Sequence, residues 1–268
     1  MEAVGFVLPE VATAAGWIAS ALGRGGRLFY VGAGTSGRLG TLDAAECPPT
    51  FGTKPRQVQA VIAGGRRALT RAVEGAEDDT RAGARALRLK RLGAKDVVCG
   101  ISASATTPFV LGALEHARRR GAKTILVCCN PEARSAPVAD VVIAPDTGPE
   151  LIAGSTRLKA GTATKLVLNA LSTAAMVALG KVFRGRMVDV NPLNQKLRVR
   201  AERMVAELAE LPLPEARALL AKARGQPKVA LAMHFGNLTR GQAVRALAEK
   251  GLRQLAAAPG KPGRTRAR

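Results

Sequence analysis

The chain has 268 residues, of which 47% are hydrophobic and only 3% aromatic, so it suits one large domain with an appendage and a core built from aliphatic side chains. The chain has four cysteines, two of them adjacent at Cys128 and Cys129, and this spacing excludes a disulfide framework. Its two histidines are far apart in sequence, so we expect no metal or other cofactor. No apolar stretch approaches the length of a membrane span, and no basic region precedes the apolar N-terminal stretch as it would in a signal peptide. We therefore expect a cytoplasmic protein without a membrane partner. The net charge of +21 raises nucleic acid as a possible partner.

Short β-branched runs alternate with longer helical patterns, and each run ends in a cluster of Gly, Ser or Pro. The predicted strands are residues 28–31, 57–62, 96–101, 123–129 and 138–144. The predicted helices are residues 36–47, 68–76, 80–92, 108–120 and 155–179. This order predicts an α/β fold with one doubly wound, parallel, five-stranded sheet of flavodoxin-like plan. Its ligand should lie at the carboxyl ends of the strands.

After residue 190 the strand-like runs stop, and Ala, Leu, Glu and Arg dominate. Short helices are predicted at residues 214–223, 228–234 and 239–255, each too short to be stable alone, so they should pack as a small C-terminal bundle. We therefore expect a catalytic domain over residues 1–200, a helical domain over 201–256 and a disordered basic tail over 257–268.

The first glycine-rich loop, GAGTSGR over residues 32–38, follows a predicted strand and opens a helix. Its glycines let the backbone approach a ligand, and the hydroxyl of Ser36 with the helix N-terminal amides can hold an anion. A dinucleotide-binding loop is the competing interpretation. It is weaker, because no acidic residue closes the next strand.

A second loop, ISASATTP over residues 101–108, again lies between a strand and a helix. The hydroxyls of Ser102, Ser104 and Thr107 converge on the start of the helix, as a phosphate monoester requires. Ordinary N-capping is the alternative for an isolated Ser/Thr turn. Two such loops at one edge of a sheet favour a phosphate site.

Two glutamates stand in irregular positions, Glu46 before a Pro-Pro pair and Glu77 after a glycine between two helices. Carboxylates at such points can face a cleft, although composition alone is equally consistent with surface charges. Arg157 and Lys159, at the start of the last long helix of the α/β part, could add positive charge near the ligand or contact a dimer partner.

Several segments resemble, in order, the N-acetylmuramic acid 6-phosphate etherases, which have the sugar isomerase (SIS) fold. They are GAGTSGRLGTLDAAECPPTFG over residues 32–52, AVEGAEDD over 72–79, CNP over 129–131, GSTRLKAGTATKLVLNALST over 154–173 and MVDVNPLNQKL over 187–197. The resemblance extends over nearly the whole chain. Several long segments in one order are far more specific than a single loop.

The resemblance implies a carbon–oxygen lyase that releases D-lactate from C3 of the sugar and adds water to give N-acetylglucosamine 6-phosphate. By matching motif, Glu46 and Glu77 are its catalytic pair, with Glu46 assigned as proton donor. The phosphate is expected at Ser36, Ser102, Ser104 and Thr107. A homodimer, no metal, and a role in amino sugar catabolism and cell wall recycling are implied as well.

Two departures from the family pattern bear on these expectations. The family usually has a further segment before the stretch that opens this chain, which affects the expected dimer packing and part of the cleft. Ala105 stands where the family usually has Gly. If that position needs a positive φ, Ala costs about 1 kcal/mol there.

Three other functions remain as alternatives. A noncatalytic SIS-type sugar-phosphate sensor would keep the phosphate loops but has no need of both Glu46 and Glu77. A hexose-phosphate isomerase would share the fold but not the ECPP and GAED segments. Specific nucleic-acid binding rests only on the charge, since the basic residues are scattered without aromatic residues between them and no helix-turn-helix pattern occurs. We expect a solvated basic surface instead.

Overall fold

The computed structural model describes residues 1–135, 138–190 and 195–257. Its contacts divide the chain into two compact units, one formed by residues 1–48 and 53–179, the other by residues 49–52 and the chain from Gly180 onward. The predicted domain boundary is at residue 200, whereas the contacts place it at Gly180, because Phe183 and Val188 pack in the core of the second unit. The predicted disordered tail lies outside the described residues from position 258.

The first unit is built on a five-stranded parallel sheet in the order β2-β1-β3-β4-β5, as the sequence predicts. The strands are β1 (Leu28–Gly32), β2 (Val58–Ile62), β3 (Val97–Ile101), β4 (Lys123–Val127) and β5 (Val141–Ile143). β1 and β3 are buried along their whole length, which explains why both read as unbroken apolar runs. Gly32 at the end of β1 is level with Ile62 and Ile101 on its two neighbours.

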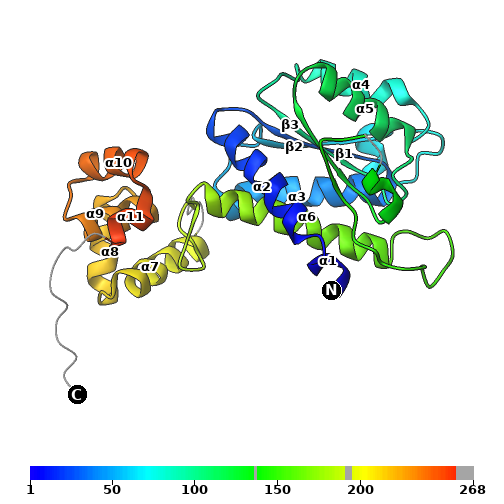
Figure 1. Ribbon diagram of the computed structural model, residues 1–268. Helices are drawn as coiled ribbons and strands as arrows, with labels where there is room; N and C mark the ends of the chain where they lie inside the picture. Colours follow the sequence, from blue (N-terminus) through cyan, green and yellow to red (C-terminus); the bar gives the residue numbers. More distant parts are fainter. Residues whose placement is uncertain (136–137, 191–194, 258–268) are drawn as a thin grey trace. The chain divides into compact units, whose positions relative to one another are not determined.

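Helices cover both faces of this sheet, as Figure 1 shows. On one face lie α4 (Thr80–Leu89) and α5 (Pro108–Arg119), and on the other α2 (Leu8–Gly23), α3 (Gly34–Phe51) and α6 (Lys159–Ala178), preceded by the short α1 (Glu2–Gly5). A Cβ added at Gly112 would lie 2.0 Å from the carbonyl oxygen of Thr80, so α4 and α5 pack closer than larger residues permit. The layered architecture is therefore the predicted doubly wound one.

Three predicted helices differ from the structure, and one observed helix was not predicted. The helix predicted at residues 68–76 is wrong: only a 3-10 helix, Gly65–Leu69, forms there, and the chain then turns through Gly75 at φ +70°. α3 continues past its predicted end at residue 47, through the Pro-Pro pair, to Phe51. The helix predicted at residues 239–255 is interrupted at Gly251, which has φ +71°. The sequence analysis also did not predict α2, which covers the sheet.

Where the structure describes it, the second unit consists of helices and a small hairpin of β6 (Val182–Phe183) and β7 (Arg186–Met187). Its helices are α7 (Gln195–Ala209), α8 (Leu213–Lys222), α9 (Pro227–Gly236), α10 (Arg240–Glu249) and α11 (Gly251–Ala257). They enclose a core of their own that includes Val205, Leu220 and Leu231. Within the described ranges no helix of either unit combines the length and apolar character that crossing a membrane requires.

Candidate active site

The first predicted phosphate loop lies at the carboxyl edge of the sheet. Gly34, at φ +50°, opens α3 directly after β1, and Ser36 stands half-buried in the first turn. A Cβ on Gly37 would lie 2.5 Å from the side chain of Ile62 and 2.8 Å from the carbonyl oxygen of Gly32. The glycine therefore lets the start of α3 sit against the ends of β1 and β2, with its amides at the ligand edge.

The second loop brings its hydroxyls together. The Oγ of Ser102 and the Oγ1 of Thr107 are 2.7 Å apart, and the loop is pinned to β4 by the amide of Cys129, which donates to the Ala103 carbonyl at 2.9 Å. Thr107 is the N-cap residue of α5, yet its side chain makes no capping bond. Ser104 is exposed beside them. The Thr107 hydroxyl thus does not cap α5, whereas Ser102, which is buried, and Ser104 accept hydrogen bonds from the amides of Thr107 and Thr106 within the loop.

Ala105, inside this second loop, has φ +67°. This is the left-handed region, which costs a residue with a Cβ about 1 to 2 kcal/mol. Ala stands here at the position where the resembled family usually has Gly. The loop therefore forms with its hydroxyls converging, but with backbone strain at its centre.

Glu77 lies next to both loops. It lines a cavity of about 180 Å³ together with Gly34 of the first loop, Arg38 and Arg71. Its backbone carbonyl accepts a hydrogen bond from the amide of Phe109, two residues beyond Thr107, at 2.9 Å. The turn through Gly75 that replaces the predicted helix is what brings this carboxylate to the ligand edge.

Glu46 does not line that cavity. It is exposed on α3, and at 1.5 Å per residue it lies roughly 18 Å along the helix axis from Gly34. Leu42, one turn earlier, is 50% exposed although it is apolar. Of the two glutamates that the motifs pair, only Glu77 therefore lines this cavity. The cavity at Glu77 is also smaller than the roughly 300 to 1,000 Å³ usual for ligand sites.

A buried polar cluster fixes α3 in place. Asp43 is 5% exposed and accepts hydrogen bonds from the Tyr30 hydroxyl at 2.8 Å, the Asn169 amide at 2.9 Å and the Ser172 hydroxyl at 3.1 Å. Burial raises the pKa of the Asp43 carboxyl above its ordinary value, and the three hydrogen bonds oppose that rise. The cluster ties α3 to β1 and α6, and so positions the helix that carries Ser36 and Glu46.

The sequence analysis missed three residues at or near the site: Arg38, Arg71 and Asp43. Each lies inside or beside a segment quoted for the family resemblance. The available signal was a charged side chain among small or apolar neighbours.

Arg157 and Lys159 do not line the cavity at Glu77. They line a separate one of about 640 Å³ with Met1 and Leu151.

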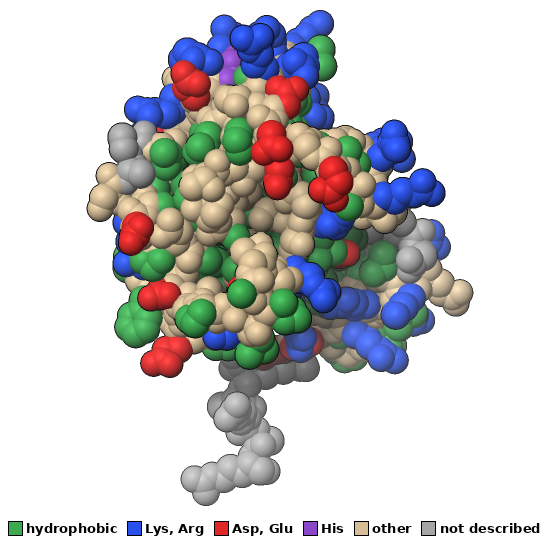
Figure 2. Space-filling model, turned by 90° about the vertical axis from the view of Figure 1, so that its right-hand side faces the viewer, with side chains coloured by type: hydrophobic (Ala, Val, Ile, Leu, Met, Phe, Trp, Pro, Cys, Tyr) green, Lys and Arg blue, Asp and Glu red, His purple; other side chains and the backbone are tan. Residues whose placement is uncertain are grey.

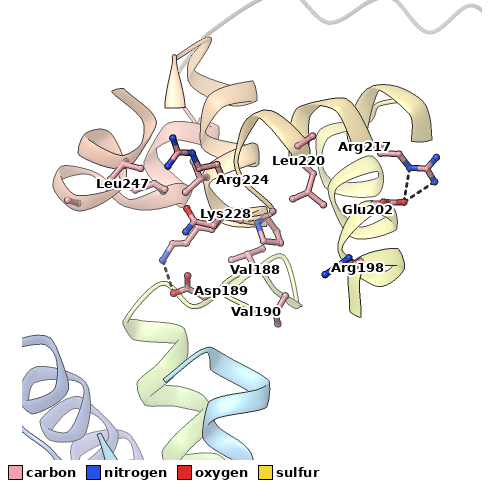
Figure 3. Close-up of a pocket in the computed structure, with 17 residues that line it drawn as sticks. Val188, Asp189, Val190, Arg198, Glu202, Arg217, Leu220, Arg224, Lys228 and Leu247 are labelled. Atoms are coloured by element: carbon pink, nitrogen blue, oxygen red, sulfur yellow. Dashed lines mark hydrogen bonds and ion pairs between the residues drawn. The ribbon is translucent and has the colours of Figure 1, made fainter. Parts of the chain in front are cut away.

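Larger cavities lie in the second unit, and none of the predicted site residues lines them. One of about 810 Å³ contains Asp189, Lys228, Arg224 and Arg198 (Figure 3). Asp189 pairs there with Lys228 at 3.4 Å. Because these side chains largely serve packing and ion pairs within the helical unit, size alone does not mark the active site.

The high positive charge gathers on another surface, over α4 and α5 (Figure 2). Arg81, Arg88 and Arg119 are exposed there. Burial, together with the charges of Arg88, Arg119 and Arg120, lowers the pKa of His116. This is the solvated basic face that the sequence predicts, and it lies outside the cavity at Glu77. No group of three His, Cys, Asp or Glu side chains that could hold a metal ion occurs in the described part of the chain.

Comparisons with known proteins place the chain among similar sequences. A family model described as the glucokinase regulatory protein N-terminal SIS domain matches residues 10–118. The N-acetylmuramic acid 6-phosphate etherase of Gloeobacter violaceus is 58% identical over 237 residues, covering 88% of this chain and 78% of that protein. N-acetylmuramic acid 6-phosphate etherase 2 of Vibrio cholerae is 49% identical and covers 92% of this chain and 80% of its own length. The solved structure of a phosphoheptose isomerase from Neisseria gonorrhoeae overlaps 65% of this chain and 89% of its own, at 19% identity and a TM-score of 0.48.

Proposed function

The chain belongs to the N-acetylmuramic acid 6-phosphate etherase family, and from that premise we propose which of its residues carry out the reaction. The enzyme is a carbon–oxygen lyase of amino sugar metabolism, which the relatives support over a sensor or a hexose-phosphate isomerase. The observation that carries the proposal is the position of Glu77, which lines a cavity with Gly34 of the first loop and accepts a backbone hydrogen bond from Phe109 in the first turn of α5, just after the second loop.

In the open-chain sugar, the aldehyde at C1 acidifies the proton on C2. One carboxylate removes this proton, and the C3–oxygen bond to the lactyl group breaks as the other carboxylic acid protonates the departing oxygen. Water then adds to C3 of the unsaturated aldehyde and a proton returns to C2, which gives N-acetylglucosamine 6-phosphate and D-lactate. We assign Glu77 to the C2 proton and Glu46 to the leaving oxygen.

The phosphate is held by Ser36, Ser102, Ser104 and Thr107 together with the amides at the starts of α3 and α5. This assignment is supported by the convergence of the Ser102 and Thr107 hydroxyls, which are 2.7 Å apart at the carboxyl edge of the sheet. Phosphate bound there places the sugar above the strand ends, next to Glu77. No metal is needed, since two carboxyl groups account for both proton transfers.

We further propose a homodimer in which each active site combines Glu77 of one chain with Glu46 of the other. The axial rise of roughly 18 Å along α3 from Gly34 to Glu46 supports this, because it carries Glu46 away from the loop that lines the Glu77 cavity. The exposed Leu42, one turn before Glu46, supports an apolar contact at this part of the helix. A second copy would also enlarge the small cavity at Glu77.

A cytoplasmic location and a role in cell wall recycling complete the proposal. All four cysteines are unpaired, which suits a reducing compartment. Burial raises the pKa of Cys47 to about 12 and that of Cys129 to about 11, so neither thiol is a nucleophile at neutral pH.

The direct test is to incubate the purified protein with N-acetylmuramic acid 6-phosphate and measure D-lactate, with and without a chelator. Release that the chelator does not reduce is expected. Glu46→Gln and Glu77→Gln should each lower turnover by about 10² to 10⁴ fold, because glutamine keeps the shape but cannot exchange protons. Absence of lactate from a folded protein that binds the sugar phosphate would favour the sensor function.

Co-expressing the two glutamine variants tests the shared site. In a symmetric dimer, half of the assemblies are mixed and one of their two sites is intact, so about a quarter of the wild-type activity should return. No recovery, although mixed dimers are present, would place both glutamates in one chain's site.

A further inference from the structure

The cavity at Glu77 contains two arginines with different surroundings. Arg38 is used by the fold: its Nε donates to the carbonyl of Leu69 at 3.2 Å and its guanidinium NH2 group to the carbonyl of Arg71 at 3.1 Å. Arg71 lines the same cavity and is exposed. Its guanidinium has no hydrogen-bond or ion-pair partner among the described residues.

Arg38 therefore acts as a clamp on the segment that carries Arg71. One of these carbonyls belongs to Leu69, the last residue of the 3-10 helix Gly65–Leu69, and the other to Arg71 in the segment that leads on to Glu77. Position 71 is thus fixed by its backbone while its side chain stays unpaired at the cavity. An unpaired guanidinium on a held backbone, in the same cavity as Glu77, suits the recognition of an anionic group on the ligand.

The substrate carries two anionic groups, a phosphate at C6 and the carboxylate of the lactyl ether at C3. The serine and threonine loops account for the phosphate. The lactyl carboxylate lies close to the bonds that break, and hence close to Glu77. Glu74 and Glu77 also line this cavity. Because their negative charges repel a third carboxylate, the lactyl carboxylate binds there only if a cation pairs with it.

We propose that Arg71 binds the lactyl carboxylate of the substrate, and so selects ether-bearing sugar phosphates over those that lack the lactyl group. The inference rests on the proposed function. A guanidinium can meet a carboxylate through two parallel hydrogen bonds, which fixes the orientation of the group as well as its charge. Arg71 thereby orients the C3–oxygen bond for elimination. It is a specificity and positioning residue that takes no part in proton transfer.

Arg71→Met separates this role from phosphate binding, because the product N-acetylglucosamine 6-phosphate keeps the phosphate and lacks the lactyl group. In a Glu46→Gln background, where turnover is slowed by about 10² to 10⁴ fold, calorimetry should show substrate affinity falling by about 10 to 100 fold, as expected for a lost charge-assisted hydrogen bond. Affinity for the product should stay within about twofold, since no lactyl contact is lost there. Arg71→Lys should fall between the two, because it keeps the charge without the paired geometry.

Arg67→Ala is the matched control. Arg67 is exposed, precedes Arg71 by one helical turn and does not line the cavity, so its replacement should change neither affinity. Equal loss of substrate and product affinity in Arg71→Met would overturn the proposal, and so would no loss of either. The proposed function is judged separately, by whether the wild-type protein releases D-lactate at all.

Discussion

Replacing Ala105 with Gly should stabilise the first unit. Ala105 has φ +67°, a conformation that costs about 1 to 2 kcal/mol for a residue with a Cβ. Glycine removes that strain, but the greater conformational freedom of its unfolded chain lowers the stability by about 0.4 to 1 kcal/mol. The net gain should be about 0.5 to 1 kcal/mol, or a rise of roughly 1 to 4 °C in Tm for a unit of this size.

Trp17 provides the probe for this measurement. It is the only tryptophan of the chain and lies on α2 in the first unit, with the Lys123 ammonium 4.9 Å from its ring centroid. Its fluorescence during denaturant or thermal unfolding therefore reports the unit that contains Ala105. The second unit does not contribute to the signal.

Ala103→Gly, two residues earlier in the same loop, is the control. Ala103 does not have a positive φ, so glycine there brings only the entropic cost and should destabilise by about 0.5 to 1 kcal/mol. Opposite signs for the two substitutions would establish that backbone strain at position 105 is the cause. Equal destabilisation by both glycines would refute the reasoning.

Two further predictions concern the phosphate loop and the buried carboxyl. Ser104→Ala should weaken binding of the sugar phosphate by roughly tenfold or more in calorimetry, because a hydrogen bond to a charged group is lost, and equal binding of the sugar without its phosphate would show that the cradle is misplaced. Burial raises the pKa of Asp43 above its ordinary 3.8. Between the unfolded-state and native-state pKa values, the native state therefore keeps a proton that the unfolded state releases, and the stability falls as the pH rises through this window. Asp43→Asn, whose amide can still bond Tyr30 and Asn169, should remove this fall, so its Tm relative to wild type should increase over the window; a constant difference across pH would contradict the assignment.

Local patterns along the chain are sufficient to predict the sheet and its ligand edge. The strands are short apolar runs buried on both faces, and such runs are visible without tertiary information. Because parallel strands share one carboxyl edge, the order of strands and helices is enough to place the loops at Ser36 and Ser102 together. The strain at Ala105 is foreseeable as well, since a family position usually occupied by Gly suggests a positive φ.

The tertiary structure decided what depends on contacts between distant residues. The segment predicted as a helix at residues 68–76 instead turns, because positive φ at Gly75 and the bonds from Arg38 to the carbonyls of Leu69 and Arg71 hold another conformation. Helical periodicity carries no information about such a clamp. The same holds for the two glutamates: the motifs pair Glu46 with Glu77, but the direction of α3 away from the ligand edge separates them within one chain. Sequence specifies which side chains are present, whereas the path of the backbone through the packed layers decides which of them can meet.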